Sequence, residues 1–201
     1  MIGSGDLVDS VRMTTPAFAA VALVLFQLVS SHGTAKPAAP ADAPASAGGI
    51  SWTVPKGWTV APAASSMRVV TYRTAAAPGD AEGGEVAVFY FGEGQGGGID
   101  ANVQRWFGQF QPEGKGPSAQ KQSKTKVNGL DVTLCSTEGT YSAGMGMGMG
   151  SAGPKSGFAL KGAIATGPGG SVFFKLTGPK KTVEKSGAEF DALVKSLKKA
   201  G

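Results

Sequence analysis

The dipeptide Asn128-Gly129 constrains the fold of this chain more than any other feature. It separates two strand-like runs, KQSKTKV at 121–127 and LDVTLCSTEGTY at 130–141. Asn-Gly accepts the positive φ values of a type I′ turn, which joins two antiparallel strands through a two-residue loop. The middle of the chain is therefore predicted to be a β-hairpin.

Other strand-like runs lie on both sides of this hairpin. MRVVTYR (67–73) and EVAVFYF (85–91) are rich in β-branched and aromatic residues, and the loop-like sequence between them predicts a second hairpin. GFALKGAIAT (157–166) and SVFFKLTG (171–178) flank a Gly-Pro-Gly-Gly turn and predict two more strands. An alternating run at 50–54 adds a strand at the start of the domain.

Two segments carry helical periodicity instead. Apolar residues at i, i+3, i+4 and i+7 lie on one face of a helix, and we expect that face to pack in the core. The first segment has this spacing at Val103, Trp106, Phe107 and Phe110. The second has it at Phe190, Leu193, Val194 and Leu197. The start of this final helix is open between Thr182 and a capping box, Ser186-x-x-Glu189.

The predicted order of elements is β-β-β-α-β-β-β-β-α. This order indicates an α+β fold, with a single antiparallel β-sheet of about six to seven strands covered by two helices.

A glycine motif tests this topology. Gly92, Gly94 and Gly97 have the G-x-G-x-x-G spacing of a dinucleotide-binding loop and lie between a strand-like run and a helical segment. In such proteins a parallel strand follows the helix. Here a hairpin follows, and Glu113, at the distance expected of a ribose-binding acid, falls in a turn. We interpret the glycines as a flexible connection and expect no nucleotide cofactor.

The two ends of the domain resemble a known fold. The domain opens with W-x-V-P-x-G-W from Trp52 to Trp58 and closes with FFKLTGP followed by FDALVKSLK. With the order of strands and helices over 50–199, these motifs resemble the PsbP-like fold, named for an extrinsic photosystem subunit and shared by a nuclear-import factor that binds a small GTPase. The chain is also similar to uncharacterised exported bacterial proteins with the same opening. The resemblance implies a non-catalytic domain that docks onto proteins or other envelope components.

The N-terminus predicts export. The apolar run AFAAVALVLFQLV at 17–29 is shorter than the roughly 20 residues of a membrane-spanning helix and fits the core of a signal peptide. Small residues before Ala35 predict a signal peptide over 1–35, whose removal leaves the protein periplasmic or secreted. The acidic start leaves open whether Met1 or Met13 is the initiator. The alternative is an uncleaved run at 17–29 that anchors the protein in the membrane.

Residues 36–49, KPAAPADAPASAGG, contain no large apolar side chain. They predict a disordered Pro/Ala-rich linker, because such a segment buries too little surface to order itself. The folded domain is accordingly expected over 50–199.

The scarcity of histidine excludes several mechanisms. The only histidine is His32, which is lost with the predicted signal peptide. Ser–His–Asp triads, Cys–His pairs and histidine-based zinc sites all need an imidazole. The single cysteine, Cys135, excludes a disulfide within the chain, and we interpret it as a packed thiol, with an exposed reactive thiol as the alternative. No catalytic residue is assigned, and a small hydrolase ranks last because no two acids are singled out.

The charged residues indicate neither a nucleic-acid-binding surface nor a calcium site. The net charge is +5, but the lysines are scattered, with no arginine cluster and no interleaved aromatic residues. We therefore expect no nucleic-acid partner. Asp80, Glu82 and Glu85 lack the dense ligand spacing of a calcium loop and are interpreted as part of a solvated turn.

A methionine segment, GMGMGMG at 144–150, is the candidate metal site. Its thioethers, Met145, Met147 and Met149, are soft ligands suited to Cu(I). The alternative is a low-complexity loop without a ligand, since no histidine or cysteine lies nearby to complete a site. We expect no other cofactor.

Four aromatic residues are candidates for a binding surface: Trp52, Trp58, Tyr72 and Tyr90. They form one only if they lie on the solvent face, and otherwise they cover the core. The sequence thus predicts an exported, non-catalytic binding or assembly module of the cell envelope, whose partner is an unidentified envelope protein or surface component. A metal-handling envelope protein that uses the methionine segment is the alternative.

Overall fold

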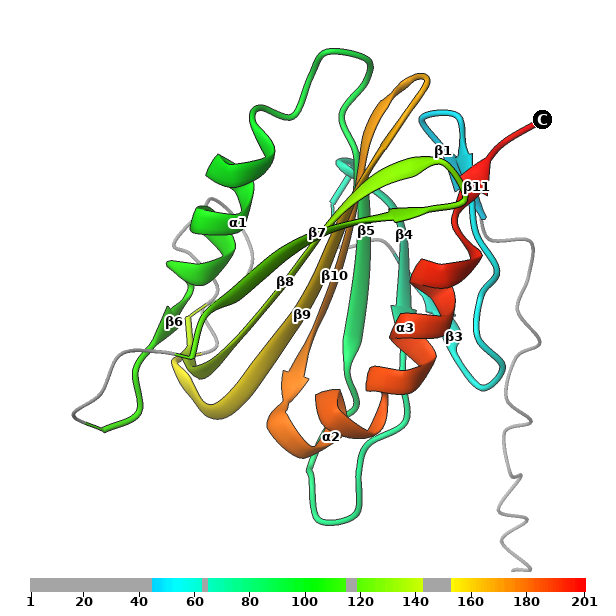
Figure 1. The fold of residues 1–201 in the computed structure, drawn as a ribbon. Helices are drawn as coiled ribbons and strands as arrows, with labels where there is room; N and C mark the ends of the chain where they lie inside the picture. The colour runs from blue at the N-terminus through cyan, green and yellow to red at the C-terminus, as the bar shows by residue number, and fades with distance from the viewer. Residues whose placement is uncertain (1–44, 63–64, 115–118, 143–152) are drawn as a thin grey trace, which may run out of the picture. The chain divides into compact units, whose positions relative to one another are not determined.

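An antiparallel sheet forms the centre of the fold (Figure 1). The computed structural model describes residues 45–62, 65–114, 119–142 and 153–201, all within the chain unit 37–201. In these residues the sheet has eight strands in the order β3-β4-β5-β10-β9-β8-β6, with β7 also paired to β8. The strands are β3 (Thr59–Ala61), β4 (Arg68–Arg73), β5 (Glu85–Tyr90), β6 (Phe110–Gln111), β7 (Lys121–Val127), β8 (Leu130–Tyr141), β9 (Lys155–Gly167) and β10 (Gly170–Pro179).

The predicted α+β fold with a large antiparallel sheet is confirmed, although the sheet has more strands than expected. β7 and β8 pair around Asn128 and Gly129, whose φ values of 47° and 80° fit the predicted type I′ turn. β4 pairs with β5, and β9 pairs with β10. Every strand pairing in the described residues is antiparallel, so the helix that follows β5 belongs to no βαβ unit there.

A second, small sheet revises the predicted start of the domain. It consists of β1 (Ser46–Ala47), β2 (Ile50–Ser51) and β11 (Lys198–Lys199). β1 belongs to the segment predicted as linker, so the ordered chain begins before residue 50. Gly48 and Gly49 make this possible, because their φ values of 55° and 72° turn the chain back on itself. A Cβ atom at Gly48 would lie only 2.8 Å from the ring of Tyr90.

Helix α1 (Ile99–Phe107) forms where the apolar spacing predicts it, but it ends before Phe110. Val103, Trp106 and Phe107 are buried on one side of the helix. The helix ends at Gly108, and Phe110 lies in β6, where it pairs with Tyr141. Phe110 still packs in the same apolar cluster. The spacing is therefore right about its burial and wrong about its conformation, because pairing with β8 replaces the helix there.

The predicted C-terminal helix is divided in two. α2 (Lys180–Lys185) begins before Thr182, and α3 (Gly187–Ser196) follows it after Ser186. The capping box does not form, because its side chains have distant partners: the Ser186 hydroxyl donates to Thr74 Oγ1. Glu189 accepts a hydrogen bond from Trp58 Nε1 at 2.8 Å. The predicted apolar stripe is buried, as expected: Phe190, Leu193, Val194 and Leu197.

The sheet separates two apolar clusters, because successive side chains of a strand point to opposite faces. On β10, Val172, Phe174 and Leu176 pack with α3, and we call their side of the sheet the closed face. Phe173 and Lys175 point to the other side, where α1 packs, and we call it the groove face. Figure 1 shows α1 and α3 beside different parts of the sheet. No helix in the described ranges is long and apolar enough to cross a membrane.

Candidate binding groove

An open groove with a volume of about 810 Å³ lies on the groove face. It lies between α1, the end of β5, the middle of β10 and Met67, the residue before β4. Large apolar side chains form much of its wall: Met67, Phe89, Phe91, Trp106 and Phe173. Polar and basic side chains complete it: Asn102, Arg105, Gln109, Ser142 and Lys175. We call this hollow the aromatic groove. Its volume falls within the range of about 300–1,000 Å³ that is typical of small-molecule sites.

The rim of the aromatic groove exposes large apolar side chains to solvent. Met67 is 59% exposed and Phe91 is 36% exposed. Among the described residues, the only other large exposed hydrophobic side chain is Val60, which lies on β3, away from the groove. Exposed apolar surface gathered at a concave site, rather than scattered, is typical of a surface that contacts a ligand.

Aromatic rings form the inner wall of the groove. The Phe91 ring lies 5.5 Å from the Phe173 ring, edge to face, and 6.1 Å from the Phe89 ring, in a stacked arrangement. The Trp106 ring meets Phe173 edge-on at 6.4 Å. A Cβ atom at Gly162 would lie 2.6 Å from the Trp106 ring, so glycine there lets Trp106 approach the sheet. The rings hold one another in place, with Trp106 and Phe173 buried and Phe91 exposed at the rim.

The glycine motif sets the position of α1 beside this wall. Its three glycines have φ values of 101°, 67° and 76°, which residues with side chains rarely adopt. The side-chain amide of Asn102 then donates to the carbonyl oxygens of Gly96 and Gly98 at 2.7 and 3.0 Å. These hydrogen bonds fasten the connection to the first turns of α1. The motif therefore shapes one side of the groove.

Lys175 is the unusual residue of the groove, because it is a lysine with only 8% of its surface exposed. Its Nζ donates to Gln109 Oε1 and lies 5.4 Å from the centre of the Tyr141 ring. Burial, and secondarily the charge of Arg68, lowers the pKa of Lys175 to about 8. Among the described residues, no acidic side chain forms an ion pair with it.

A smaller polar hollow of about 150 Å³ adjoins the aromatic groove and shares Phe89 and Lys175 with it. Its acidic side chains are already engaged. Glu85 accepts from Arg68 at 2.8 Å and from Arg73 at 2.9 Å. The other acid, Glu82, pairs with Lys155. The aromatic groove thus has a basic end.

Cys135 lies beneath the aromatic groove, in the cluster that contains Trp106 and Phe173. It is 4% exposed. Burial raises the pKa of its thiol to about 12, with a smaller opposing effect from Lys175. The interpretation of Cys135 as a packed thiol is confirmed, and such a thiol stays protonated near neutral pH.

The aromatic residues predicted as a possible binding surface do not form one. Trp52, Trp58 and Tyr72 are buried in the cluster of the closed face. The Trp52 indole donates to the Tyr72 hydroxyl at 3.1 Å, which satisfies a polar group inside the core. Tyr90 is half-buried and its hydroxyl donates to the carbonyl of Gly169 at 2.7 Å. The alternative interpretation, that these residues cover the core, is correct for Trp52, Trp58 and Tyr72.

Sequence reasoning missed the residues that the structure brings together at the groove. Met67, Phe91 and Lys175 come from separate strand-like runs, and none belongs to a recognisable motif. One signal was available, since Lys175 interrupts the apolar residues of the predicted strand SVFFKLTG. A charge in such a strand indicates a special site.

The other candidate ligands of the sequence analysis do not converge. Asp80 accepts hydrogen bonds from the backbone and hydroxyl of Thr182, whereas Glu82 and Glu85 pair with separate basic residues. No group of three acidic, cysteine or histidine side chains in the described part of the chain is arranged to hold a metal ion. Met145, Met147 and Met149 lie outside the described residues, so the copper hypothesis stays a prediction.

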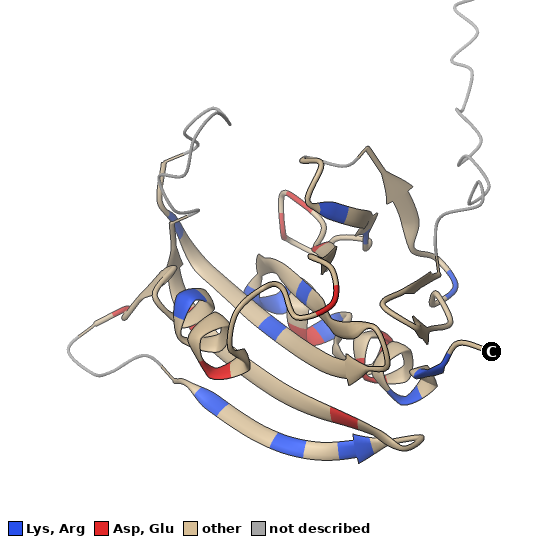
Figure 2. Ribbon diagram, turned by 90° about the horizontal axis from the view of Figure 1, so that it is seen from above, with Lys and Arg blue, Asp and Glu red and all other residues tan. Residues whose placement is uncertain are grey.

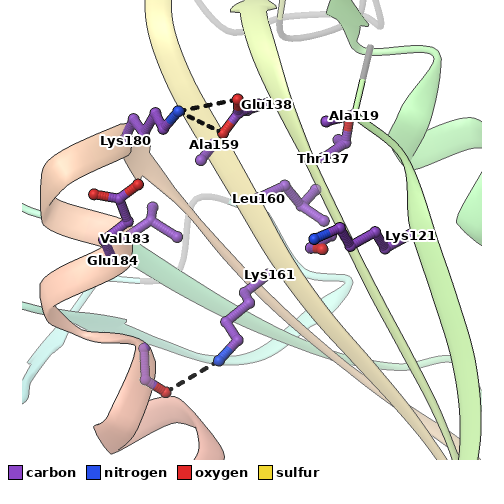
Figure 3. A pocket seen from close by; sticks show the side chains of 12 residues that line it. Ala119, Lys121, Thr137, Glu138, Ala159, Leu160, Lys161, Lys180, Val183 and Glu184 are labelled. Carbon is purple, nitrogen blue, oxygen red and sulfur yellow. Dashed lines mark hydrogen bonds and ion pairs between the residues drawn. The ribbon is translucent and has the colours of Figure 1, made fainter.

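A second pocket, of about 360 Å³, lies between α2 and the strands β8 and β9. Figure 3 shows Lys180 extending from α2 to Glu138, and these side chains form an ion pair at 2.9 Å. Lys161, also in the pocket, pairs with Asp191 at 2.7 Å. Lys161 and Lys180 thus have acidic partners, and Lys121, the third lysine of the wall, is exposed on β7. This pocket therefore holds no buried, uncompensated charge like that of Lys175.

Figure 2 shows how the other charges are distributed. Lys and Arg residues occur on several strands and helices, with acidic residues among them, and β7 carries a series of lysines along the edge of the sheet. Lysines on an edge strand protect it from pairing with other chains. This explanation accounts for the series without a ligand.

No protein family matches the sequence, and no curated protein matches it. Among solved structures, the chain is similar to cyanobacterial PsbP (CyanoP) from Synechocystis sp. PCC 6803, with 13% identity over 75% of this chain and 86% of that one and a TM-score of 0.47. It is also similar to LpqN of Mycobacterium tuberculosis, a protein involved in cell envelope biogenesis, with 13% identity over 74% and 82% of the two chains and a TM-score of 0.46.

A third similar structure is PA94 of Pseudomonas aeruginosa, a protein of unknown function, with 12% identity over 69% of this chain and 94% of that one and a TM-score of 0.43. The PsbP-like fold expected from the sequence is thus found among the structures that this chain resembles. At these identities the likeness concerns the fold alone.

Proposed function

We propose that the chain is an exported, non-catalytic binding domain of the cell envelope, and that the aromatic groove holds the apolar part of its ligand. The observation that carries this proposal is the exposure of Met67 and Phe91 on the rim of a wide, open hollow. In water such a surface is unfavourable, and covering it with a ligand removes that cost at roughly 25 cal/mol for each Å² of apolar area.

The chemistry of the described residues supports binding rather than catalysis. Cys135 is a poor nucleophile near neutral pH because burial raises its pKa to about 12. The only histidine of the chain, His32, precedes the described residues. The acids beside the groove are held in ion pairs with arginine or lysine, which disfavours a role in proton transfer.

Export and the site of action rest on the sequence. The apolar run at 17–29, followed by small residues before Ala35, supports passage through a membrane. A domain that then remains outside the cytoplasm meets membrane lipids, envelope polymers and envelope proteins, and the apolar wall of the groove favours a ligand with an apolar portion.

Binding of the neutral fluorescent probe N-phenyl-1-naphthylamine to the full chain tests this function. We expect saturable binding, and we expect the double variant Met67→Ser/Phe91→Ser to bind about tenfold or more weakly, because it removes most of the exposed apolar rim. The matched control is Val60→Ser, which removes an apolar side chain that is 40% exposed outside the groove and leaves the affinity unchanged. Equal affinities of all three proteins would show that the probe binds elsewhere and would contradict the proposal.

A further inference from the structure

Lys175 gives the aromatic groove a property that an apolar ligand does not explain. Its ammonium group is buried, and a buried charge without an opposite charge is unfavourable by several kcal/mol in general. Its neighbours do not compensate it. Gln109 is neutral, the Tyr141 ring offers only its π face, and Arg68 repels it.

The nearest carboxylate does not fill this role either. Glu85 lowers the cost of the Lys175 charge, but its two oxygens are bound by Arg68 and Arg73. The internal segments outside the described residues, 63–64, 115–118 and 143–152, contain no Asp or Glu. Among the described residues, no other carboxylate acts on Lys175, so a bound ligand can supply the missing negative charge.

The walls of the aromatic groove and the polar hollow together carry an excess of positive charge. Five basic side chains line the two hollows, against two acidic ones: Arg68, Arg73, Arg105, Lys155 and Lys175 against Glu82 and Glu85. Both acids are engaged by neighbouring arginine or lysine side chains. Lys175 belongs to the walls of both hollows, where the apolar surface meets the basic end.

We propose that the ligand is an amphiphile with an apolar chain and a single carboxylate, with the carboxylate on Lys175 and the chain along Phe89, Phe91 and Phe173. This assignment rests on the proposed function and names the chemical class of its ligand. It accounts for two features at once, because the chain covers the exposed apolar rim and the carboxylate supplies the missing counter-charge.

The hydrogen-bonding capacity of Lys175 favours a carboxylate over a phosphate. An ammonium group has three donors, and Gln109 takes one of them, so two remain for the ligand. A carboxylate brings one negative charge and accepts both. A phosphate monoester brings about −1.5 to −2 charges on three oxygens, which exceed both the single charge of Lys175 and its two remaining donors.

Competition for the same fluorescent probe, with the full chain, tests the assignment. Three competitors carry saturated chains of 11 or 12 carbons, differ in their head group and are used below the concentration at which they form micelles: dodecanoate, methyl dodecanoate and dodecyl phosphate. Near neutral pH, we expect dodecanoate to bind at least about tenfold more tightly than the uncharged ester, because one charge-assisted hydrogen bond contributes about that difference in affinity. Dodecyl phosphate is expected to bind less tightly than dodecanoate.

The decisive variant is Lys175→Met. We expect it to lose the preference for dodecanoate, with the affinity for the methyl ester unchanged or higher. The matched control is Lys161→Met, which removes a lysine from the second pocket and keeps the preference. Lys175→Arg, which stays protonated at any accessible pH, is expected to restore it.

The pH profile separates the charge of Lys175 from its shape. The charged groups that face it are Arg68 and Glu85, and the titratable ones are Cys135 and Tyr141, whose pKa values burial raises. We expect the wild-type preference for dodecanoate to decline above about pH 8, where Lys175 loses its proton, and that of Lys175→Arg to persist to about pH 9.5.

The outcomes distinguish the two proposals. If wild type binds the ester and the carboxylate equally, the assignment of the carboxylate to Lys175 is overturned and the apolar groove remains. A tighter complex with dodecyl phosphate overturns the choice of head group. If the groove binds neither the competitors nor the probe, the proposed function itself is overturned.

Discussion

The two faces of the central sheet are built from the same strands and differ in how completely they are covered. On the closed face, α2, α3 and the small second sheet accompany a continuous core in which Phe174 and Tyr72 are fully buried. On the groove face, α1 covers part of the strands and leaves Phe91 exposed beside a buried lysine. The closed face serves stability, and the groove face retains features that cost stability.

This difference is a common property of binding sites. A buried charge lowers the free energy of unfolding, and an exposed apolar side chain adds little to it, so such groups persist where binding requires them. Lys175 and Phe174 are neighbours on one strand, yet they point to opposite faces and have opposite expected effects on stability. Substitutions on the two faces test this contrast directly.

The largest expected effect is on the closed face. Phe174 is fully buried and meets the Trp52 ring edge-on at 5.1 Å. Phe174→Ala is expected to lower the free energy of unfolding by about 3–5 kcal/mol, because it leaves a cavity in a packed core. The control on the groove face, Phe91→Ala, should lower it by less than about 1.5 kcal/mol. Urea unfolding followed by circular dichroism measures both, and equal losses would remove the distinction between the faces.

A smaller effect of opposite sign is expected at Lys175. Lys175→Met should raise the free energy of unfolding by about 1–3 kcal/mol near neutral pH, because it replaces a buried charge by an apolar side chain of similar length. The pKa of Lys175 is about 8 in the folded protein, below its ordinary value of 10.5. Between these values the unfolded chain binds more protons, so wild-type stability rises with pH and the advantage of the variant shrinks.

Urea unfolding of both proteins at several pH values measures this difference. A variant that is less stable than wild type at every pH would show that Lys175 stabilises the fold, and its presence would then need no ligand. A constant difference across the same pH range would contradict the assigned cause.

The smallest expected effect on stability concerns the hydrogen bonds that join the β7–β8 hairpin to the end of α3. The Asn128 side-chain amide donates to the carbonyls of Lys195 and Leu197, which ties the β7–β8 hairpin to the end of α3. Asn128→Gly keeps the positive φ and loses these hydrogen bonds, so it should cost about 1 kcal/mol. Asn128→Ala loses both the bonds and the favourable φ, and should cost more. Thermal unfolding compares them, and equal costs would mean that backbone strain contributes nothing.

Much of the fold follows from local sequence patterns. The β7–β8 turn was predictable because few residues other than Asn and Gly adopt two successive positive φ values. The buried stripes of α1 and α3 were predictable because helical periodicity depends only on spacing. The end of α1 and the division at Ser186 were not, because both depend on distant partners, β8 in one case and Thr74 in the other.

The candidate site was much less predictable than the fold. Because side chains alternate between the two faces of a strand, Phe173 and Lys175 share a face. This alternation does not say whether a helix covers that face. The conspicuous tryptophans, Trp52 and Trp58, are candidates for a binding surface by residue type but are buried in the core. Met67, in an ordinary strand-like run, lies on the rim of the groove.

By itself, the sequence determined the hairpins, the antiparallel character of the sheet and the absence of an imidazole after residue 32, because each depends on residue type or on spacing within a few positions. Only the tertiary structure decided which face of the sheet stays open and that Lys175 lies in an aromatic groove. Those features depend on where α1 and α3 pack, which is set by contacts between residues that are far apart in the chain.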